Sequence, residues 1–208
     1  MRRLAVIGAS GHGKVVADIA ESCGWEAIDF FDDGYRQKTV NENWPIVGDL
    51  ADLLAASISY AGVVVAIGDN EVRRRVCETV LANSIVLVTL IHPAAVVSRY
   101  AQIGDGSVVV AGAVINAYAV IGRGVIINTC ASIDHDCCLG DYVHISPGAH
   151  LAGGVNVGHG SWVGIGSCIK QQVTVGTNVR VGAGAVVIND VQDNLTVAGV
   201  PARSLNIK

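Results

Sequence analysis

A six-residue repeat runs without interruption from Ala95 to Asp190. Divided into sixes, this stretch gives sixteen blocks, and the third residue of every block is Val, Ile or Leu. The first residue of each block is Ala, Ser, Val or Cys, and is therefore small. A second period of 18 residues, or three blocks, separates Gly104, Gly122, Gly140, Gly158 and Gly176. A period of six within a period of 18 is typical of a parallel β-helix with triangular coils.

Each block is predicted to form one short strand and one corner. The aliphatic third residue points inward, and the small first residue lies beside it because a narrow prism has no room for a larger side chain. Gly, Asn and Asp at the corners tolerate the left-handed backbone of a sharp turn. A β-sandwich would instead need hairpins and irregular loops, which an unbroken frame argues against. We therefore predict an all-β parallel β-helix over residues 92–208, with about five coils in the repeat.

The first 91 residues show a different pattern, in which strands alternate with helices. Short apolar runs predict strands at residues 3–7, 27–31, 62–67 and 85–90. Apolar residues spaced by three or four predict helices at about 14–23, 49–54 and 71–81, and residues 41–48 are predicted to be a loop. This alternation is typical of a small α/β domain with a parallel, Rossmann-like sheet.

Three polar or glycine-rich loops follow the first three predicted strands: Gly8–Gly13, Asp32–Gly34 and Gly68–Asn70. The first is G-x-x-G-x-G rather than the dinucleotide-binding G-x-G-x-x-G, but small residues before a helix still let a phosphate approach. Asp32 and Asp33 can accept hydrogen bonds from a ribose or a base. Each loop alone also suits a plain turn. Because all three lie at the carboxyl edge of one sheet, they predict a nucleotide-binding site.

Composition excludes several classes of protein. The net charge of −4 argues against a nucleic-acid partner. No apolar run approaches the ~18–20 residues of a membrane-spanning helix. The six cysteines form no C-x-x-C pair, and the chain begins without a signal-peptide pattern. We therefore expect a cytoplasmic protein with no membrane span.

Reactive side chains in the repeat gather around Asp134-His135-Asp136. A corner histidine flanked by carboxylates can be oriented and made more basic, as a general base requires, although a solvated turn histidine is the plainer alternative. His144 is nine residues from His135, half of an 18-residue coil, so the two side chains should lie on opposite sides of the prism. Two neighbouring chains could bring such residues together, which predicts a site at a subunit interface.

A metal site is a competing interpretation of this cluster. Neighbouring residues of a strand alternate between faces, so the side chains of residues 134–138 cannot all converge on one ion. Regular zinc-ligand spacing is absent from the sequence. A zinc site of the γ-carbonic-anhydrase kind would need three histidines at a spacing that His135, His144 and His150 do not have. We therefore expect no metal.

Several motifs together resemble one family. They are the hexapeptide frame, the Gly8–Gly13 loop, Asp32-Asp33, Asn128-Thr129, His135-Asp136, His144 and the tail Gly199-Val200-Pro201-Ala202-Arg203. This set is similar to the sugar O- and N-acetyltransferases of the left-handed β-helix class. Within that class, it most resembles the bacterial UDP-4-amino-sugar N-acetyltransferases of the UDP-N-acetylbacillosamine type, which are related to sialic acid O-acetyltransferases. The resemblance covers both predicted domains in the same order.

The resemblance implies a left-handed helix, a homotrimer with active sites between subunits, and acetyl-CoA as co-substrate. It makes His135 the general base and Asp136, where relatives often have Glu, the residue that raises its basicity. It assigns acetyl-CoA contacts to His144 and to the backbone of Ile165 and Ala183. It assigns the nucleotide-sugar to positions on the N-terminal domain: Ser10, Gly11, His12, Asp32, Asp33 and Gly68.

The sequence thus predicts an acetyltransferase acting on the 4-amino group of a UDP-linked amino-deoxy sugar by direct attack. Two alternatives keep the fold and the donor: O-acetylation of sialic acid or another sugar, and N-acetylation of a GDP-linked 4-amino sugar. A third belongs to another class, a nucleotide-sugar-binding β-helix protein without catalysis. The Asp134-His135-Asp136 cluster and the tail from Gly199 to Arg203 disfavour that third alternative.

Overall fold

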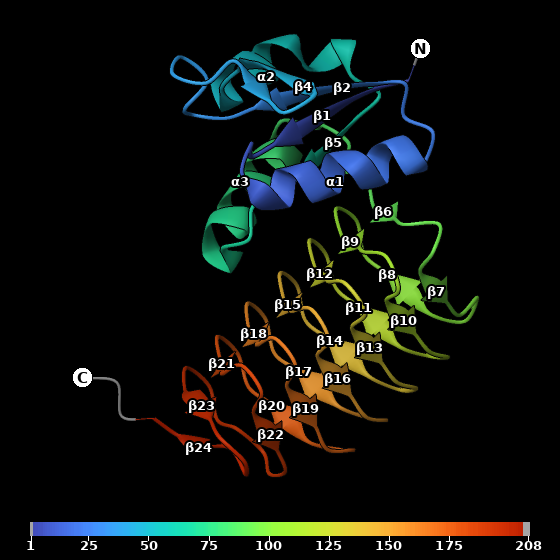
Figure 1. The fold of residues 1–208 in the computed structure, drawn as a ribbon, viewed down its shortest axis with the longest axis vertical. Coiled ribbons are helices and arrows are strands. Elements are labelled where there is room, and N and C mark those ends of the chain that lie inside the picture. Colours follow the sequence, from blue (N-terminus) through green and yellow to red (C-terminus); the bar gives the residue numbers. More distant parts are fainter. Residues whose placement is uncertain (1, 206–208) are drawn as a thin grey trace. The chain divides into compact units, whose positions relative to one another are not determined.

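The computed structural model describes residues 2–205, which divide into two compact units on either side of the Pro93–Ala94 bond. The sequence placed this division two residues earlier, after residue 91. The first unit is an α/β domain and the second is a parallel β-helix (Figure 1). Among the described residues, none of the helices is both long and apolar enough to cross a bilayer.

The first unit contains a five-stranded sheet with the order β3-β4-β2-β1-β5. Its central strands are parallel, with β1 between β2 and β5, and only β3 is antiparallel to its neighbour β4. Its strands are β1 (Arg3–Ile7), β2 (Ala27–Phe31), β3 (Val40–Asn41), β4 (Trp44–Gly48) and β5 (Gly62–Val65). The two-residue strand β6 (Leu90–Ile91) does not belong to this sheet. The helices are α1 (Gly11–Ser22), α2 (Leu50–Ala56), α3 (Asn70–Ala82) and a 3-10 turn (Ser57–Ser59).

Two of the sequence predictions for this unit are wrong. Residues 41–48 are not a loop, because β3 and β4 form a hairpin around Glu42, whose φ is 55°. Tertiary packing decides this, since Ile46 is buried and the Trp44 ring meets Phe30 edge to face at 6.2 Å. Residues 85–90 do not form a full strand: Leu87 makes only an isolated bridge to Val63.

Both long helices begin earlier than the apolar spacing predicts. Helix α1 starts at Gly11, with Ser10 as its N-cap, so three of the loop residues belong to its first turn. Helix α3 starts at Asn70, where the Asp69 carboxylate accepts hydrogen bonds from the N–H groups of Glu71 and Val72. For α3, a polar cap rather than the first apolar residue therefore sets where the helix begins, whereas the Ser10 side chain makes no capping hydrogen bond to α1.

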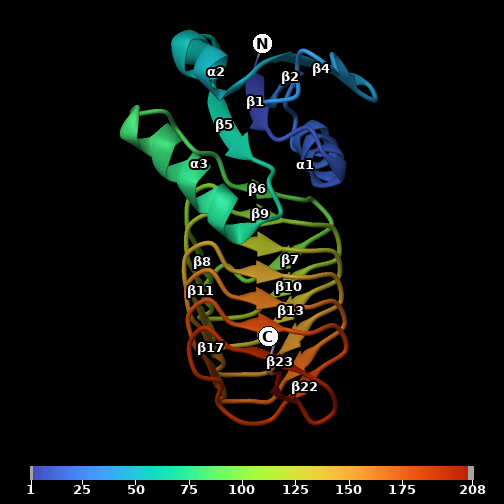
Figure 2. The same ribbon diagram turned by 90° about the vertical axis from the view of Figure 1, so that its left-hand side faces the viewer.

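The second unit is a left-handed parallel β-helix, as predicted, with one two-residue strand for each six-residue block. Figures 1 and 2 show the coils stacked on one another. One flat face contains β7 (Val96–Val97), β10 (Val114–Ile115), β13 (Ser132–Ile133), β16 (His150–Leu151), β19 (Cys168–Ile169) and β22 (Val186–Val187). The second contains β8 (Gln102–Ile103), β11 (Val120–Ile121), β14 (Cys138–Leu139), β17 (Asn156–Val157) and β20 (Thr174–Val175). The third contains β9 (Val108–Val109), β12 (Ile126–Ile127), β15 (His144–Ile145), β18 (Trp162–Val163), β21 (Arg180–Val181), β23 (Thr196–Ala198) and β24 (Arg203–Ser204).

The core of the β-helix is built from the two repeating positions that the sequence singled out. From Val109 onward the third-position aliphatics are buried, and so are first-position residues such as Ala131 and Cys137. The 18-residue glycine period has a steric cause: a Cβ on Gly140 would lie 2.7 Å from the backbone nitrogen of His159 in the next coil. The coils thus approach closely at this corner, and only glycine allows it.

Candidate active site

His135 lies on the corner that follows β13, and two carboxylates hold it. Its Nδ1 is 2.7 Å from Oδ2 of Asp136. Oδ1 of Asp134 accepts hydrogen bonds from the His135 backbone N–H at 2.8 Å and from the Asn116 side chain at 3.0 Å. The hydrogen bond to Asp136, and then the charge of Asp134, raise the pKa of His135 above its ordinary value. This is the geometry of an exposed, oriented general base.

The position of the His135 ring depends on the backbone of Asp136 and on the absence of a side chain at Gly153 in the next coil. Asp136 has a left-handed φ of 60°, which turns its carboxylate back onto its neighbour. The short aspartate therefore reaches the ring. When Asp136 holds the proton on Nδ1, Nε2 is the atom free to accept a proton. A Cβ on Gly153 would lie 2.6 Å from Cε1 and Nε2, so the ring lies over this glycine.

Sequence reasoning missed Gly153. The signal was its spacing: Gly153 is 18 residues, one coil, after His135 and therefore occupies the same corner position. Its backbone is outside the left-handed region, so the turn itself does not demand glycine. The contact with the His135 ring gives a reason for glycine at this position.

His144 is in β15, on a different face of the prism from β13. Its ring is buried and stacks on Trp162 with 4.6 Å between ring centroids. Its Nε2 is 3.2 Å from the Asn128 side-chain nitrogen. The chain therefore does not bring His144 and His135 together, in agreement with their spacing of half a coil. The predicted contact of His144 with acetyl-CoA stays a prediction.

Ile165 and Ala183 lie on the corner that follows β18 and β21, and both are exposed. They occupy the same position in successive coils, and the N–H of Gly184 donates to the carbonyl of Ile165 at 2.8 Å. This corner is not the corner of His135. The predicted base and the predicted cofactor positions therefore lie on separate edges of one prism.

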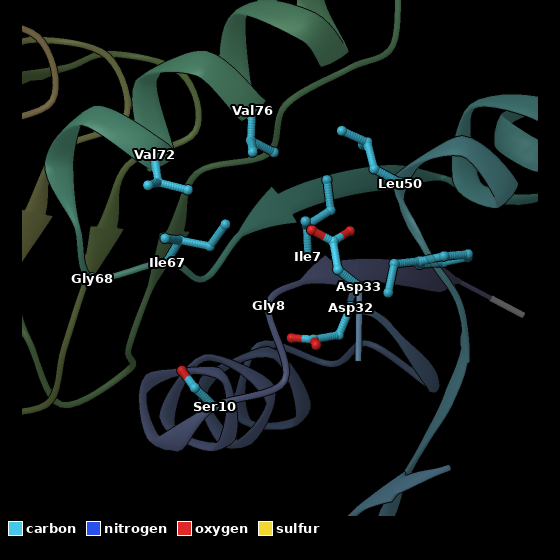
Figure 3. A pocket seen from close by; sticks show the side chains of 11 residues that line it. Ile7, Gly8, Ser10, Asp32, Asp33, Leu50, Ile67, Gly68, Val72 and Val76 are labelled. Carbon is cyan, nitrogen blue, oxygen red and sulfur yellow. The ribbon is translucent and has the colours of Figure 1, made fainter. Parts of the chain in front are cut away.

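The first unit contains a cavity of about 300 Å³ at the carboxyl ends of β1, β2 and β5 (Figure 3). The chain runs from β1 to β2 on one side, while β5 pairs on the other, so the cavity lies where the strand order reverses. The lining residues are Ile7, Gly8, Ser10, Phe31, Asp32, Asp33, Leu50, Ile67, Gly68, Val72 and Val76. The cavity thus combines apolar walls with a few polar groups, as small-molecule sites do.

The two neighbouring aspartates in this cavity have different roles. Asp32 accepts hydrogen bonds from the backbone N–H of Ala9 at 2.8 Å and of Gly34 at 2.9 Å, one on each carboxylate oxygen. Asp32 therefore ties the first loop to the second. Asp33 is exposed, and within residues 2–205 its carboxylate has no hydrogen-bond partner. Asp33 is thus the carboxylate that is available to a ligand.

The glycines of the first and third loops also divide into two kinds. Gly8 has a φ of 104°, and a Cβ on Gly13 would lie 2.3 Å from the Gly8 carbonyl oxygen, so the fold itself requires both. A Cβ on Gly11 or Gly68 would meet nothing within 4 Å. The Ser10 hydroxyl makes no capping bond to α1. Ser10 and Gly68 therefore leave a hydrogen-bonding group and space for a ligand in the cavity, whereas Gly11 is not one of the lining residues.

His12 is in the first turn of α1 but is not one of the residues that line the cavity. Burial, and then the charge of Arg73, lower the pKa of His12 to about 4, so its ring is neutral. Arg73, which the sequence did not single out, donates from Nη1 to the carbonyls of Ile67 and Gly68 at 3.0 Å each. Arg73 thereby holds the third loop of the cavity in place.

Among the described residues, no group of three or more His, Cys, Asp or Glu side chains has an arrangement that could hold a metal ion.

Comparison with known proteins agrees with this architecture. Residues 3–80 match the family described as the PglD N-terminal domain. The GDP-perosamine N-acetyltransferase of Escherichia coli O157:H7 is 32% identical over 217 residues, covering 99% of this chain and 97% of that protein. The chain belongs to the sugar N-acetyltransferase family. It is therefore an acetyltransferase, and the resemblance seen in the sequence is confirmed.

Two further similarities cover about half and nearly all of this acetyltransferase. The UDP-N-acetylbacillosamine N-acetyltransferase of Bacillus subtilis (strain 168) is 37% identical over 117 residues, 53% of this chain and 52% of that protein. The acetyltransferase domain of PglB from Neisseria gonorrhoeae FA1090, solved in complex with acetyl coenzyme A, superposes with a TM-score of 0.95 at 48% identity. That superposition covers 98% of this chain and 99% of the other.

Proposed function

We propose that this acetyltransferase transfers the acetyl group of acetyl-CoA to the 4-amino group of a UDP-linked amino-deoxy sugar. The observation that carries the proposal is the His135–Asp136 pair, with 2.7 Å between Nδ1 and the carboxylate, exposed on a corner of the β-helix. A general base of this kind is what an amine acceptor needs. The likeness to a complex with acetyl coenzyme A supports the choice of donor.

In the proposed reaction the 4-amino nitrogen attacks the thioester carbonyl carbon directly. The new C–N bond forms while the carbonyl π electrons move to oxygen, and the C–S bond breaks when they return. Nε2 of His135 takes the proton that the nitrogen loses and passes it to the departing CoA thiolate. Asp136 stabilises the imidazolium that exists between these transfers. Positioning of the two bound reactants supplies most of the reduction in the activation barrier. General-base catalysis contributes a rate acceleration on the order of 10²–10⁴-fold.

The active site is proposed to lie between subunits of a homotrimer. His135 is on the corner after β13, whereas Ile165 and Ala183 are on the corner after β18 and β21. One chain cannot bring both corners to a single thioester. A neighbouring chain that offers its Ile165 corner to His135 completes the site. Acetyl-CoA would then lie along the groove between two β-helices, near His144.

The nucleotide part of the acceptor is proposed to occupy the cavity at the ends of β1, β2 and β5. The Ser10 hydroxyl and the N-terminus of α1 suit the diphosphate, because the first N–H groups of a helix stabilise negative charge. The free carboxylate of Asp33 suits an N–H group of the base. Gly68 leaves the space that such a ligand needs in the cavity, and Gly11, next to the lining residue Ser10, is equally open. His12 stays a predicted substrate contact beside this cavity.

A GDP-linked 4-amino sugar is the second candidate acceptor. One observation favours it: the relative that covers 99% of this chain is a GDP-perosamine N-acetyltransferase, whereas the UDP-sugar relative covers 53%. The Asp33 carboxylate accepts from N3–H of uracil or from N1–H and the amino group of guanine. A comparison of acceptors therefore has to decide between the two nucleotides.

The deciding assay follows CoA release with a thiol reagent, in the presence of acetyl-CoA and a panel of UDP- and GDP-linked 4-amino sugars plus free sialic acid. Rapid release with one 4-amino nucleotide-sugar supports the proposal and identifies the nucleotide. Release with sialic acid alone would move the assignment to O-acetylation. Release with none of them, together with binding of a nucleotide-sugar, would indicate a binding protein.

The His135→Ala variant tests the base, and His150→Ala is its matched control on the neighbouring coil. We expect turnover to fall by ~10²–10⁴-fold in His135→Ala and to stay at the wild-type value in His150→Ala. Nearly full turnover in His135→Ala would rule out the base assignment.

We place the reaction in the cytoplasm, a proposal supported by six cysteines that are all free.

A further inference from the structure

Two lysines lie beside the first loop of the α/β unit, and they differ in how their charge is compensated. Lys14, in α1, forms an ion pair with Glu42 of the β3–β4 hairpin. Lys38, which precedes β3, donates from Nζ to the carbonyl of Ala9 at 3.3 Å and to Oδ1 of Asn41 at 2.9 Å. Among the described residues, no carboxylate forms an ion pair with Lys38. Its positive charge is therefore available to a ligand.

The side chain of Asn41 fixes the Lys38 ammonium against the loop. Asn41 is completely buried and accepts the hydrogen bond from Lys38. Its Nδ2 donates to the carbonyl of Ser10 at 3.4 Å. One buried amide thus ties the hairpin both to the loop and to the ammonium. Because Lys38 is already held in place, binding a ligand costs less side-chain entropy than binding to a free lysine would.

The position of the Lys38 ammonium is electrostatically unfavourable without an anion. Its acceptor Ala9 lies in the chain between Gly8 and Ser10, which both line the cavity (Figure 3). Helix α1 begins at Gly11 and has no acidic residue in its first turn. The N-terminus of a helix carries a partial positive charge, which repels a neighbouring cation. An anion at this place is attracted by both positive charges.

The lining of the cavity gives a second reason to look for a cation nearby. It contains the carboxylates of Asp32 and Asp33 but no lysine, arginine or histidine. A diphosphate is negatively charged at neutral pH, so two aspartates without a basic side chain would oppose its binding. A cation that is held beside the cavity offsets this repulsion.

We propose that Lys38 is a substrate-binding residue that contacts the diphosphate of the nucleotide-sugar. This inference rests on the proposed function and adds a residue to it. The β3–β4 hairpin positions that residue through Asn41, and Glu42 of the same hairpin compensates the charge of Lys14. The two lysines are therefore expected to respond differently to the same substitution.

The test measures binding of UDP and of GDP by titration calorimetry. The variant is Lys38→Gln, which removes the charge but keeps a hydrogen-bond donor for the oxygens of Ala9 and Asn41. Its matched control is Lys14→Gln, which removes the other positive charge beside this loop. We expect Lys38→Gln to raise the Kd of the nucleotide that binds by about 10- to 100-fold, because a hydrogen bond to a charged group is lost. Lys38→Arg and Lys14→Gln should stay within about threefold of the wild type.

Two further readouts separate a charge contact from a structural role of the hairpin. Raising the salt concentration should weaken nucleotide binding less in Lys38→Gln than in the wild type, because one charge contact is missing. In the CoA-release assay, the KM for the nucleotide-sugar should rise in Lys38→Gln while kcat and the KM for acetyl-CoA stay unchanged.

An unchanged Kd in Lys38→Gln, or an equal loss in Lys14→Gln, would overturn the role of Lys38 and leave the proposed function intact. A loss in Lys38→Gln that comes with a lower unfolding temperature and is not restored in Lys38→Arg would also overturn it, because the lysine would then only support the hairpin. A wild-type protein that binds neither UDP nor GDP and acetylates no nucleotide-sugar would overturn the proposed function, and this inference with it.

Discussion

Gly153→Ala should disable the proposed base without touching its own atoms. The new Cβ would lie 2.6 Å from Cε1 and Nε2 of His135, whereas ordinary contacts of a Cβ begin at 3.4 Å. The ring must therefore move by about 0.8 Å. Because a misplacement of ~1 Å can cost about 100-fold in rate, we expect kcat to fall by about that factor. The KM for the nucleotide-sugar should stay the same, because the cavity proposed to bind its nucleotide is in the other unit.

The assay is CoA release at saturating acetyl-CoA, combined with thermal unfolding. Gly153 lies outside the left-handed region, so alanine brings no backbone strain and the unfolding temperature should not fall. The pH profile is a second readout. A displaced ring weakens its bond to Asp136, so the pKa of His135 should fall toward its ordinary value and the acid limb of kcat/KM should move to lower pH.

A double-mutant cycle is the control. If alanine at 153 acts only through the ring, then the variant carrying both His135→Ala and Gly153→Ala should be as active as His135→Ala alone. Wild-type turnover in Gly153→Ala would refute the argument, since the ring would then not need its place over the glycine. A further loss in the double variant would show that the new methyl group acts elsewhere.

Four other substitutions test separate parts of the structure. Asp136→Asn removes the carboxylate whose hydrogen bond raises the pKa of His135, so kcat/KM, which needs the neutral ring, should reach its plateau at lower pH and at a lower value. Asp32→Ala leaves two backbone N–H groups without their acceptor and should lower the free energy of unfolding by about 1–3 kcal/mol, measured by urea titration. Asp33→Ala should leave that free energy unchanged but raise the KM for the nucleotide-sugar about 10- to 100-fold; equal effects of the two alanines would contradict the different roles assigned to them. Ile133→Ala, in the middle of the β-helix core, should lose about 2–5 kcal/mol of stability by calorimetry, and a loss below about 1 kcal/mol would mean that the narrow core collapses around the gap.

The β-helix was predictable because every coil repeats one local rule. An aliphatic third residue and a small first residue are needed in each block, so the period appears directly in the sequence. The same regularity located His135 and His144 on different faces, since nine residues are half a coil. The three loops at one sheet edge were also predictable, because parallel strands bring their carboxyl ends together.

The hairpin at Val40–Gly48 was not predictable in this way. Its pattern is short and mixed, and the contact of Trp44 with Phe30 decides it. The same holds for the start of α3, which depends on capping by Asp69 rather than on apolar spacing. Local propensity is too weak to settle such segments when a tertiary contact competes with it.

The sequence by itself determined the β-helix and the residue types available at its corners, because the 18-residue period specifies which residues share an edge. Only the tertiary structure decided what those residues do to one another. It separated Asp32, bonded to two backbone N–H groups, from the free Asp33, although the two are adjacent in the chain. It also put the His135 ring over Gly153 and the Tyr118 ring on Tyr100. Side-chain direction depends on the neighbouring coil, and a one-dimensional pattern does not contain it.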